Sequence, residues 1–246
     1  MHNFSNMTVR EIALEAPLST RVFESFKIDY CCGGRVPLVE ACRNAGADTF
    51  EVLAKLETVL SDRQAGFGDL PERMSPAKLI AYIVSKHHAL TRAELERLGP
   101  LAEKVASRHG EHRPELAKIK RILHELTEEL LLHMRKEETV LFPFIEKLET
   151  AIAVGEQAPM SPFGTVSNPI RMMCFEHDAA GDMLREMRSL SNDYSVPEDA
   201  CPSFKGLFAG LEDLERDLHR HIHLENNILF PQAVAMESAD LAADQS

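Results

Sequence analysis

The chain has 246 residues, 44% of them hydrophobic, and a formal net charge of −12, which suits one large or two modest globular domains. The acidic balance, with no Lys/Arg cluster on a single predicted helix, argues against nucleic acid as a direct ligand. No apolar run approaches the length of about 18 residues that a membrane span needs, and the N-terminus has no apolar signal core, so we expect a cytoplasmic protein without membrane contact.

Apolar residues recur at helical spacing almost throughout, and the alternation typical of strands is absent, so the predicted fold class is all-α. Residues 1–61 are expected to form a small helical N-terminal domain, which would be marginally stable alone. Residues 62–74 contain two glycines and a proline and are predicted to be a linker. Within the N-terminal domain, a turn is expected at 30–34 and helices are predicted over 8–16, 19–26, 36–45 and 48–60.

Residues 75–237 are predicted to form a second domain of four long helices, followed by a C-terminal tail at 238–246. Ser75 and Pro76 provide a helix cap followed by proline at the first helical position. Four amphipathic helices of this length, with a long connection at 151–168 between the second and the third, are typical of an up-down four-helix bundle. The helices are expected over 76–108, 115–148, 169–190 and 203–236.

Three prolines lie inside the long predicted helices. Pro100 removes one backbone hydrogen bond and predicts a kink or break near Gly99. Pro143 and Pro231 occupy matched positions in the second and fourth helices, so these two helices are predicted to bend alike.

One pattern occurs twice, 88 residues apart: His133-x-x-x-Glu137-x-x-x-Leu-Phe-Pro and His221-x-x-x-Glu225-x-x-x-Leu-Phe-Pro. Residues four apart lie on one face of a helix, so each copy directs an imidazole and a carboxylate to the same place. Apolar residues share that face, and a carboxylate among them is costly unless it is paired or binds metal. The alternative for a single copy is a solvated helix face, but the repetition favours two helices that together form a di-metal site.

The other two long helices carry one well-placed histidine each. His88 lies about 18 Å along the first helix and His177 about 12 Å along the third, which in an up-down bundle places both at the level of His133 and His221. His109 lies about 31 Å beyond His88 on a straight helix and could be a ligand only if the chain reversed before it. The remaining histidines are interpreted as surface or structural residues: His2, His87, His112, His124, His219 and His223.

The ligand types limit the metal. Imidazole with carboxylate suits iron, zinc or manganese, and two carboxylates shared between two ions favour iron or manganese. Glu129 and Asp217 each lie four residues before a repeat histidine, where they could orient its second ring nitrogen or act as ordinary surface salt-bridge partners.

The five cysteines show no C-x-x-C spacing and are predicted to be thiols in a reducing compartment. Cys31 and Cys32 are adjacent, precede two glycines and lie near the start of a predicted helix, which favours thiolates open to a partner. Adjacent cysteines do not easily form an unstrained disulfide, so we expect thiol, metal or nitrosyl chemistry or an intermolecular bridge. The alternative is that they are two small buried hydrophobic residues.

These motifs resemble a known family. The order His88, KEExxLFP, Glu176-His177-Asp178 and HIHLENNILFP is similar to the hemerythrin-like domain. The N-terminal YCCGG at residues 30–34 resembles the small domain fused to it in the repair-of-iron-centres proteins. The resemblance extends over residues 8–236.

The resemblance implies a hemerythrin-like bundle with two non-haem iron ions per chain, bridged by oxo or hydroxo, in a protein of the nitrosative and oxidative stress response. It implies that His88 and His133 are terminal ligands on one side, that His177 and His221 are terminal ligands on the other, and that both metals are bridged by Glu137 and Glu225.

The leading functional hypothesis is that the protein supplies iron to damaged or apo iron-sulfur proteins or scaffolds, with Cys31 and Cys32 as thiol or iron-transfer residues. One alternative is nitric oxide reduction at the same irons, which would need an external electron donor because no flavin or dinucleotide fingerprint is present. A third is a sensor or sequestering protein for nitric oxide or oxygen. No residue is firmly assigned as catalytic, and a homodimer stays open.

Overall fold

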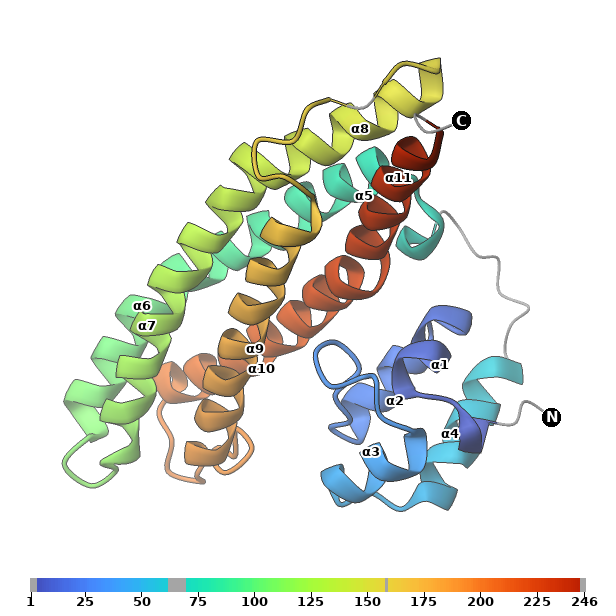
Figure 1. Cartoon of the computed structure of the whole chain (residues 1–246). Coiled ribbons are helices and arrows are strands. Elements are labelled where there is room, and N and C mark those ends of the chain that lie inside the picture. Colours follow the sequence, from blue (N-terminus) through green and yellow to red (C-terminus); the bar gives the residue numbers. More distant parts are fainter. Residues whose placement is uncertain (1–3, 62–69, 158, 244–246) are drawn as a thin grey trace.

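The computed structural model describes residues 4–61, 70–157 and 159–243 (Figure 1). Within these ranges every regular element is helical, apart from a single β-bridge between Thr8 and Pro37. The predicted all-α fold class is therefore confirmed. No helix in the described ranges is long and apolar enough to cross a membrane. Much of the predicted linker, residues 62–69, and the last residues of the predicted tail, 244–246, lie outside the described residues.

The N-terminal unit has its own core. Thr8 caps the first helix in a capping box, because its Oγ1 accepts from the N–H of Glu11 at 3.2 Å and Glu11 Oε2 accepts from the N–H of Thr8 at 2.8 Å. Gly46, with φ of 67°, ends α3 in the left-handed conformation that glycine adopts without strain. After η1 (Phe4–Asn6), the helices are α1 (Val9–Glu15), α2 (Ser19–Ser25), α3 (Leu38–Ala45) and α4 (Thr49–Ser61).

The rest of the chain forms an elongated bundle of four helical rods that run side by side (Figure 1). After η2 (Pro71–Arg73), the first rod is α5 (Pro76–Tyr82), η3 (Ile83–His88) and α6 (Ala89–His109), and the second is α7 (Glu115–Lys136), η4 (Glu137–Leu141) and α8 (Phe142–Val154). The third rod is α9 (Ser167–Leu190), and the fourth is α10 (Pro202–Leu224), η5 (Glu225–Leu229) and α11 (Phe230–Ala243). In this arrangement α6 packs on α7 and α10, and α7 packs on α9.

The segments η3, η4 and η5 are π-helical turns. In both copies of the repeat the N–H of the phenylalanine donates to the carbonyl five residues back, Phe142 to Glu137 and Phe230 to Glu225. A proline follows each phenylalanine and has no N–H for a continuous α-helical ladder. Residues five apart share a face in a π turn, so both the glutamate and the phenylalanine point into the bundle. The matched prolines thus mark matched π turns.

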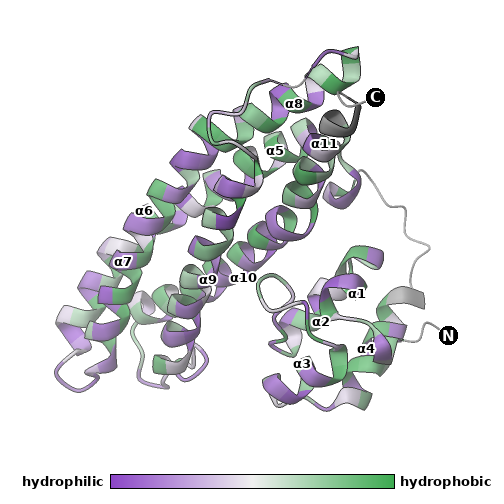
Figure 2. Ribbon diagram, viewed as in Figure 1, coloured by the Kyte–Doolittle hydropathy of each residue, from purple (hydrophilic) through white to green (hydrophobic). Residues whose placement is uncertain are grey.

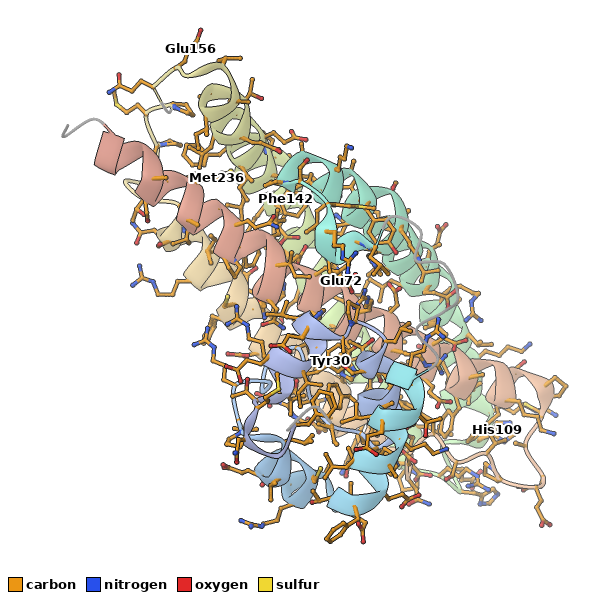
Figure 3. All side chains as sticks on the ribbon, turned by 90° about the vertical axis from the view of Figure 1, so that its right-hand side faces the viewer. Tyr30, Glu72, His109, Phe142, Glu156 and Met236 are labelled. Atoms are coloured by element: carbon orange, nitrogen blue, oxygen red, sulfur yellow. The ribbon has the colours of Figure 1, made fainter. Side chains whose placement is uncertain are left out.

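The first long rod does not break at its proline. Helix α6 continues through Pro100 to His109, so of the predicted kink or break near Gly99 the break is wrong. Leu98 and Ala102 are buried on either side of the proline, and their packing against the bundle holds the helix despite the lost hydrogen bond. His109 consequently lies at the far end of the bundle from Phe142 (Figure 3).

The bundle core is divided in two. One cluster of buried apolar residues includes Leu98, Leu123 and Leu211, and the other includes Leu79 and Phe230. Hydrophobic and hydrophilic residues alternate around the long helices, as expected of amphipathic helices (Figure 2). Between the two clusters lies a layer of buried histidines and glutamates. That polar layer is where the predicted site residues gather.

The turn that carries the YCCGG sequence faces the bundle (Figure 1). The side-chain amide of Asn227 donates to the carbonyl of Tyr30 at 3.1 Å, and the Tyr30 ring packs edge-on against His223 at 5.3 Å. Lys27 and Asp193 form an ion pair at the same interface. These contacts with α10, η5 and the loop after α9 hold the vicinal cysteines against the bundle.

Candidate metal centre

Six buried side chains converge in the polar layer. Their ligand atoms form two overlapping groups, and within each group all atoms lie within 4.8 Å of one another. Both glutamates belong to both groups, and no third group of this kind exists in the described ranges. The first group is His88, Glu137, His221 and Glu225, and the second is His133, Glu137, His177 and Glu225.

Each group contains one close pair of histidine nitrogens. His88 Nε2 lies 3.1 Å from His221 Nε2, and His133 Nε2 lies 3.0 Å from His177 Nε2. Two nitrogens bonded to one ion at about 2.1 Å, at a right angle, would be about 3.0 Å apart. The structure pairs the histidines differently from the predicted arrangement of His88 with His133, because α6 packs on α10 and α7 packs on α9.

The two carboxylates connect the groups. Glu137 Oε2 lies 3.4 Å from Nε2 of both His88 and His133, so it faces one histidine of each group. Glu225 Oε1 lies 2.8 Å from His221 Nε2, and its Oε2 lies 3.1 Å from His177 Nε2. Both oxygens of Glu137 and Oε2 of Glu225 are buried without a hydrogen bond. This is the geometry of two carboxylates that each reach two metal positions.

The buried charges of the cavity favour binding of a cation. Burial and the charge of Glu225 would raise the pKa of Glu137, but the neighbouring histidines outweigh both and lower it. Burial would lower the pKa of His88, but the two nearby carboxylates raise it to about 10, and the pKa of His133 rises to about 9 for the same reason. A multivalent cation satisfies this demand without protons, so the residues present fit a two-metal site.

Two orienting residues follow the repeat glutamates directly. The Nδ1–H of His88 donates to Glu138 Oε1 at 2.6 Å, and the Nδ1–H of His177 donates to Asn226 Oδ1 at 2.9 Å. Donation from Nδ1 leaves the lone pair on Nε2, which faces the cavity. Arg92 in turn donates to Glu138 at 2.7 Å. Sequence reasoning missed both residues, although each copy has a polar residue straight after the glutamate.

The other two histidines are supported differently. The Nδ1–H of His133 donates to Glu176 Oε2 at 2.8 Å, and Lys136 pairs with the same carboxylate. His87 directly precedes His88, just as Glu176 directly precedes His177. The ring of His87 stacks on that of His221, with ring centroids 5.7 Å apart. His221 Nδ1 is buried without a hydrogen-bond partner. The two candidate ligand groups are therefore not equivalent.

The acids four residues before the repeat histidines do not orient them. Glu129 is exposed, and Asp217 binds Nδ1 of His87 at 2.9 Å instead of His221. The second ring nitrogen of His88, His133 and His177 points to a residue on another helix and not to an acid on its own helix. His87 and His223 are fully buried, which makes them structural and excludes the surface interpretation.

The phenylalanines of the repeat fix two imidazole planes. Phe142 stacks on His88 at 5.8 Å, and Phe230 stacks on His177 at 6.1 Å. In each copy the phenylalanine and the polar residue after the glutamate therefore act on the same histidine of an adjacent rod. The Leu-Phe-Pro that ends each copy is thus part of the site.

His109 does not reach the cavity. Its Nε2 lies 3.3 Å from Cys201 Sγ, and its ring packs edge-on against Phe204 at the far end of the bundle. Of the histidines considered as ligands, His109 is the one that the structure keeps apart.

The chain matches known proteins over nearly its whole length. Residues 79–233 match the hemerythrin HHE cation binding domain. This chain belongs to the hemerythrin HHE family. Residues 5–60 match ScdA_N, a domain of unknown function. The resemblance inferred from the two repeats and the YCCGG turn is confirmed.

Relatives of this hemerythrin HHE protein share both parts. A probable iron-sulfur cluster repair protein of Haemophilus influenzae is 34% identical over 94% of this chain and 98% of its own length. Iron-sulfur cluster repair proteins YtfE of Yersinia pseudotuberculosis and Yersinia pestis are each 34% identical over 96% of this chain and 100% of theirs.

Replacing Glu225 by alanine should lower the iron content below the wild-type value, because this carboxylate belongs to both candidate ligand groups. Elemental analysis of the purified protein measures the iron, and far-ultraviolet circular dichroism checks that helicity is kept. Glu212→Ala, an exposed change on the same helix, is the control and should retain the wild-type iron content. Wild-type iron in the Glu225 variant would contradict the bridging geometry.

His109→Ala should leave iron content unchanged, since α6 carries this residue to the far end of the bundle. The same elemental analysis tests it. Loss of one ion in this variant would mean that the described path of α6 is not the one in solution.

Asn226→Ala should weaken metal binding at the His133 and His177 position by about tenfold or more, because His177 would lose the oxygen that fixes its ring. Competition with a chromogenic chelator measures the affinity. Asn168→Ala, an exposed change on α9, should behave like the wild type. Equal affinities in both variants would remove the orienting role of Asn226.

Proposed function

We propose that this protein holds two iron ions in the cavity between its repeat glutamates and supplies iron for the repair of damaged iron-sulfur clusters. The observation that carries this proposal is the pair of overlapping four-residue groups that share both carboxylates. The names of the full-length relatives support the repair role. The proposed ligands are His88, His133, His177 and His221, with Glu137 and Glu225 as bridges.

The ligand set favours an ion that can leave. Only two histidines belong to each position, and Nδ1 of His221 has no hydrogen-bond partner. Partners on the second ring nitrogen usually strengthen metal binding, so their absence favours release from the His88 and His221 position. In this proposal the protein both binds iron and releases it to an acceptor.

The vicinal cysteines are placed to receive iron. Cys32 Sγ lies 3.9 Å from the backbone carbonyl of His177, and the two thiol sulfurs are 3.7 Å apart. Two thiolates on one tetrahedral ion, with bonds of about 2.3 Å, would be separated by about 3.8 Å. The hydrogen bond to Cys32, burial and Asp29 raise the pKa of the Cys31 thiol well above its ordinary value. A metal ion would displace that proton.

The acceptors that fit this chemistry are damaged or apo iron-sulfur proteins or their scaffolds, whose own thiolates complete the transfer. All five cysteines are free thiols in the structure, which suits the reducing cytoplasm, where we place the protein. Nitric oxide and oxygen are small ligands that the same iron ions would bind.

Iron transfer can be tested directly. The full chain is loaded with labelled iron and mixed with an apo-iron-sulfur protein and a source of sulfide. We expect the label to move to the acceptor as its cluster forms. Iron that stays on the protein while added nitric oxide is consumed would contradict the donor role and favour a nitric oxide reductase.

The double variant Cys31→Ser/Cys32→Ser should bind iron like the wild type but transfer it at least several-fold more slowly, because the sulfurs beside His177 are lost. Transfer to the same acceptor gives the rate, and elemental analysis gives the loading. Cys201→Ser, at the far end of the bundle, is the matched control. An unchanged transfer rate in the double variant would reduce the YCCGG turn to a structural role.

A further inference from the structure

Only one sulfur of the vicinal pair is accessible. Cys31 is buried, its pKa is raised, and its thiol contacts Cys32 and Asp29. Cys32 is partly exposed and lines a cavity of about 490 Å³. A reagent that enters this cavity therefore meets Cys32 before any other sulfur.

The cavity lies between the N-terminal unit and the third rod of the bundle. Its walls come from the turn before α3, from α3 itself and from α9. The volume is several times that of the Cys32 side chain and suits a molecule of tripeptide size. The principal lining residues are Lys27, Asp29, Cys32, Val36, Asp178 and Arg185.

The walls carry both signs of charge. Lys27 and Arg185 present cations, and Asp29 and Asp178 present carboxylates. Arg185 lies 3.8 Å from Asp29 and donates to Asp182 at 2.5 Å, and these three side chains are 57%, 38% and 76% exposed, respectively. Solvent-exposed pairs of this kind contribute little, so a ligand carboxylate can take the guanidinium without a large penalty. A ligand with both carboxylate and ammonium groups matches such walls better than a purely anionic or purely cationic one.

We propose that this cavity binds a low-molecular-weight, zwitterionic peptide disulfide and that Cys32 exchanges with it to form a mixed disulfide. The Cys32 sulfur attacks one sulfur of the ligand, the ligand's S–S bond breaks, and the departing thiolate takes up the proton that Cys32 releases. One disulfide is consumed and one formed, so no other oxidant is needed. The exchange uses one of the two sulfurs of the proposed iron transfer, but it does not depend on that transfer.

The adduct persists because Cys31 cannot easily displace it. Consecutive Cα atoms are about 3.8 Å apart, less than the distance of about 4.4 Å or more that an unstrained disulfide spans, so a bond between these two neighbours is strained. Modified Cys32 would also cover the sulfur that faces the carbonyl of His177. The ratio of oxidised to reduced small thiols around the protein would then determine whether Cys32 carries the adduct or is a free thiol.

The test compares two disulfides on the iron-loaded full chain. Oxidised glutathione carries carboxylates and ammonium groups, and bis(2-hydroxyethyl) disulfide carries no charge. Intact-mass and peptide mass spectrometry give the modification rate and the cysteine modified. We expect a single adduct on Cys32, a rate with oxidised glutathione that saturates as its concentration rises, and a linear rate with the uncharged disulfide.

Variants separate binding from plain thiol reactivity. Arg185→Ala and Asp178→Asn should each lower the ratio of the two rates about fivefold, the size expected from one exposed charge pair. Arg43→Ala, an exposed change on α3 outside the cavity, should leave the ratio unchanged. Helicity and iron content check that each variant is intact. A linear rate with oxidised glutathione, the same ratio in all variants, or faster modification of Cys174 or Cys201 would each overturn the proposal.

Discussion

The structure depends on two carboxylates buried in the middle of a helical bundle. Glu137 and Glu225 are both 0% exposed, and their ligand atoms lie within 4.8 Å of one another. Removing one such ion from water costs several kcal/mol even after the protein relaxes. Four imidazoles surround the pair, and the raised pKa values of His88 and His133 express the same demand for positive charge. A fold with this buried layer of carboxylates and imidazoles is suited to binding cations.

The two copies of the repeat supply side chains to the cavity in the same way. In each copy a histidine and a glutamate enter the cavity from one rod, and a π turn brings the phenylalanine to the same side. The residue after the glutamate and that phenylalanine then hold a histidine of an adjacent rod, His88 in one copy and His177 in the other. The copies differ where Glu176 supports His133 and His87 stacks on His221. Two similar positions thus have different surroundings.

Local signals in the sequence predicted the helices well, because caps, prolines and amphipathic spacing act within a few residues. Thr8 and Ser75 begin helices where expected, and the four histidines reach one level. Helix length and rise alone determine that level, so His109 could also be placed far from the cavity. The residues of the site could therefore be predicted from the sequence, whereas their pairing in space could not.

What could not be predicted depends on which helices lie side by side. The pairing of His88 with His221 follows from the packing of α6 on α10. This contact joins helices far apart in the sequence, so the spacing of residues within one helix cannot predict it. Glu138 and Asn226 lie one residue off the ligand stripe and act across to another rod. The continuity of α6 through Pro100 likewise comes from core packing on both sides of the proline.

The central claim is that two ions lie side by side between the repeat glutamates. Anomalous X-ray scattering at the iron edge, from crystals of the iron-loaded full chain, tests it most directly. We expect two peaks between Glu137 and Glu225, one beside His88 and His221 and the other beside His133 and His177. A single peak, or iron located away from these glutamates, would contradict it.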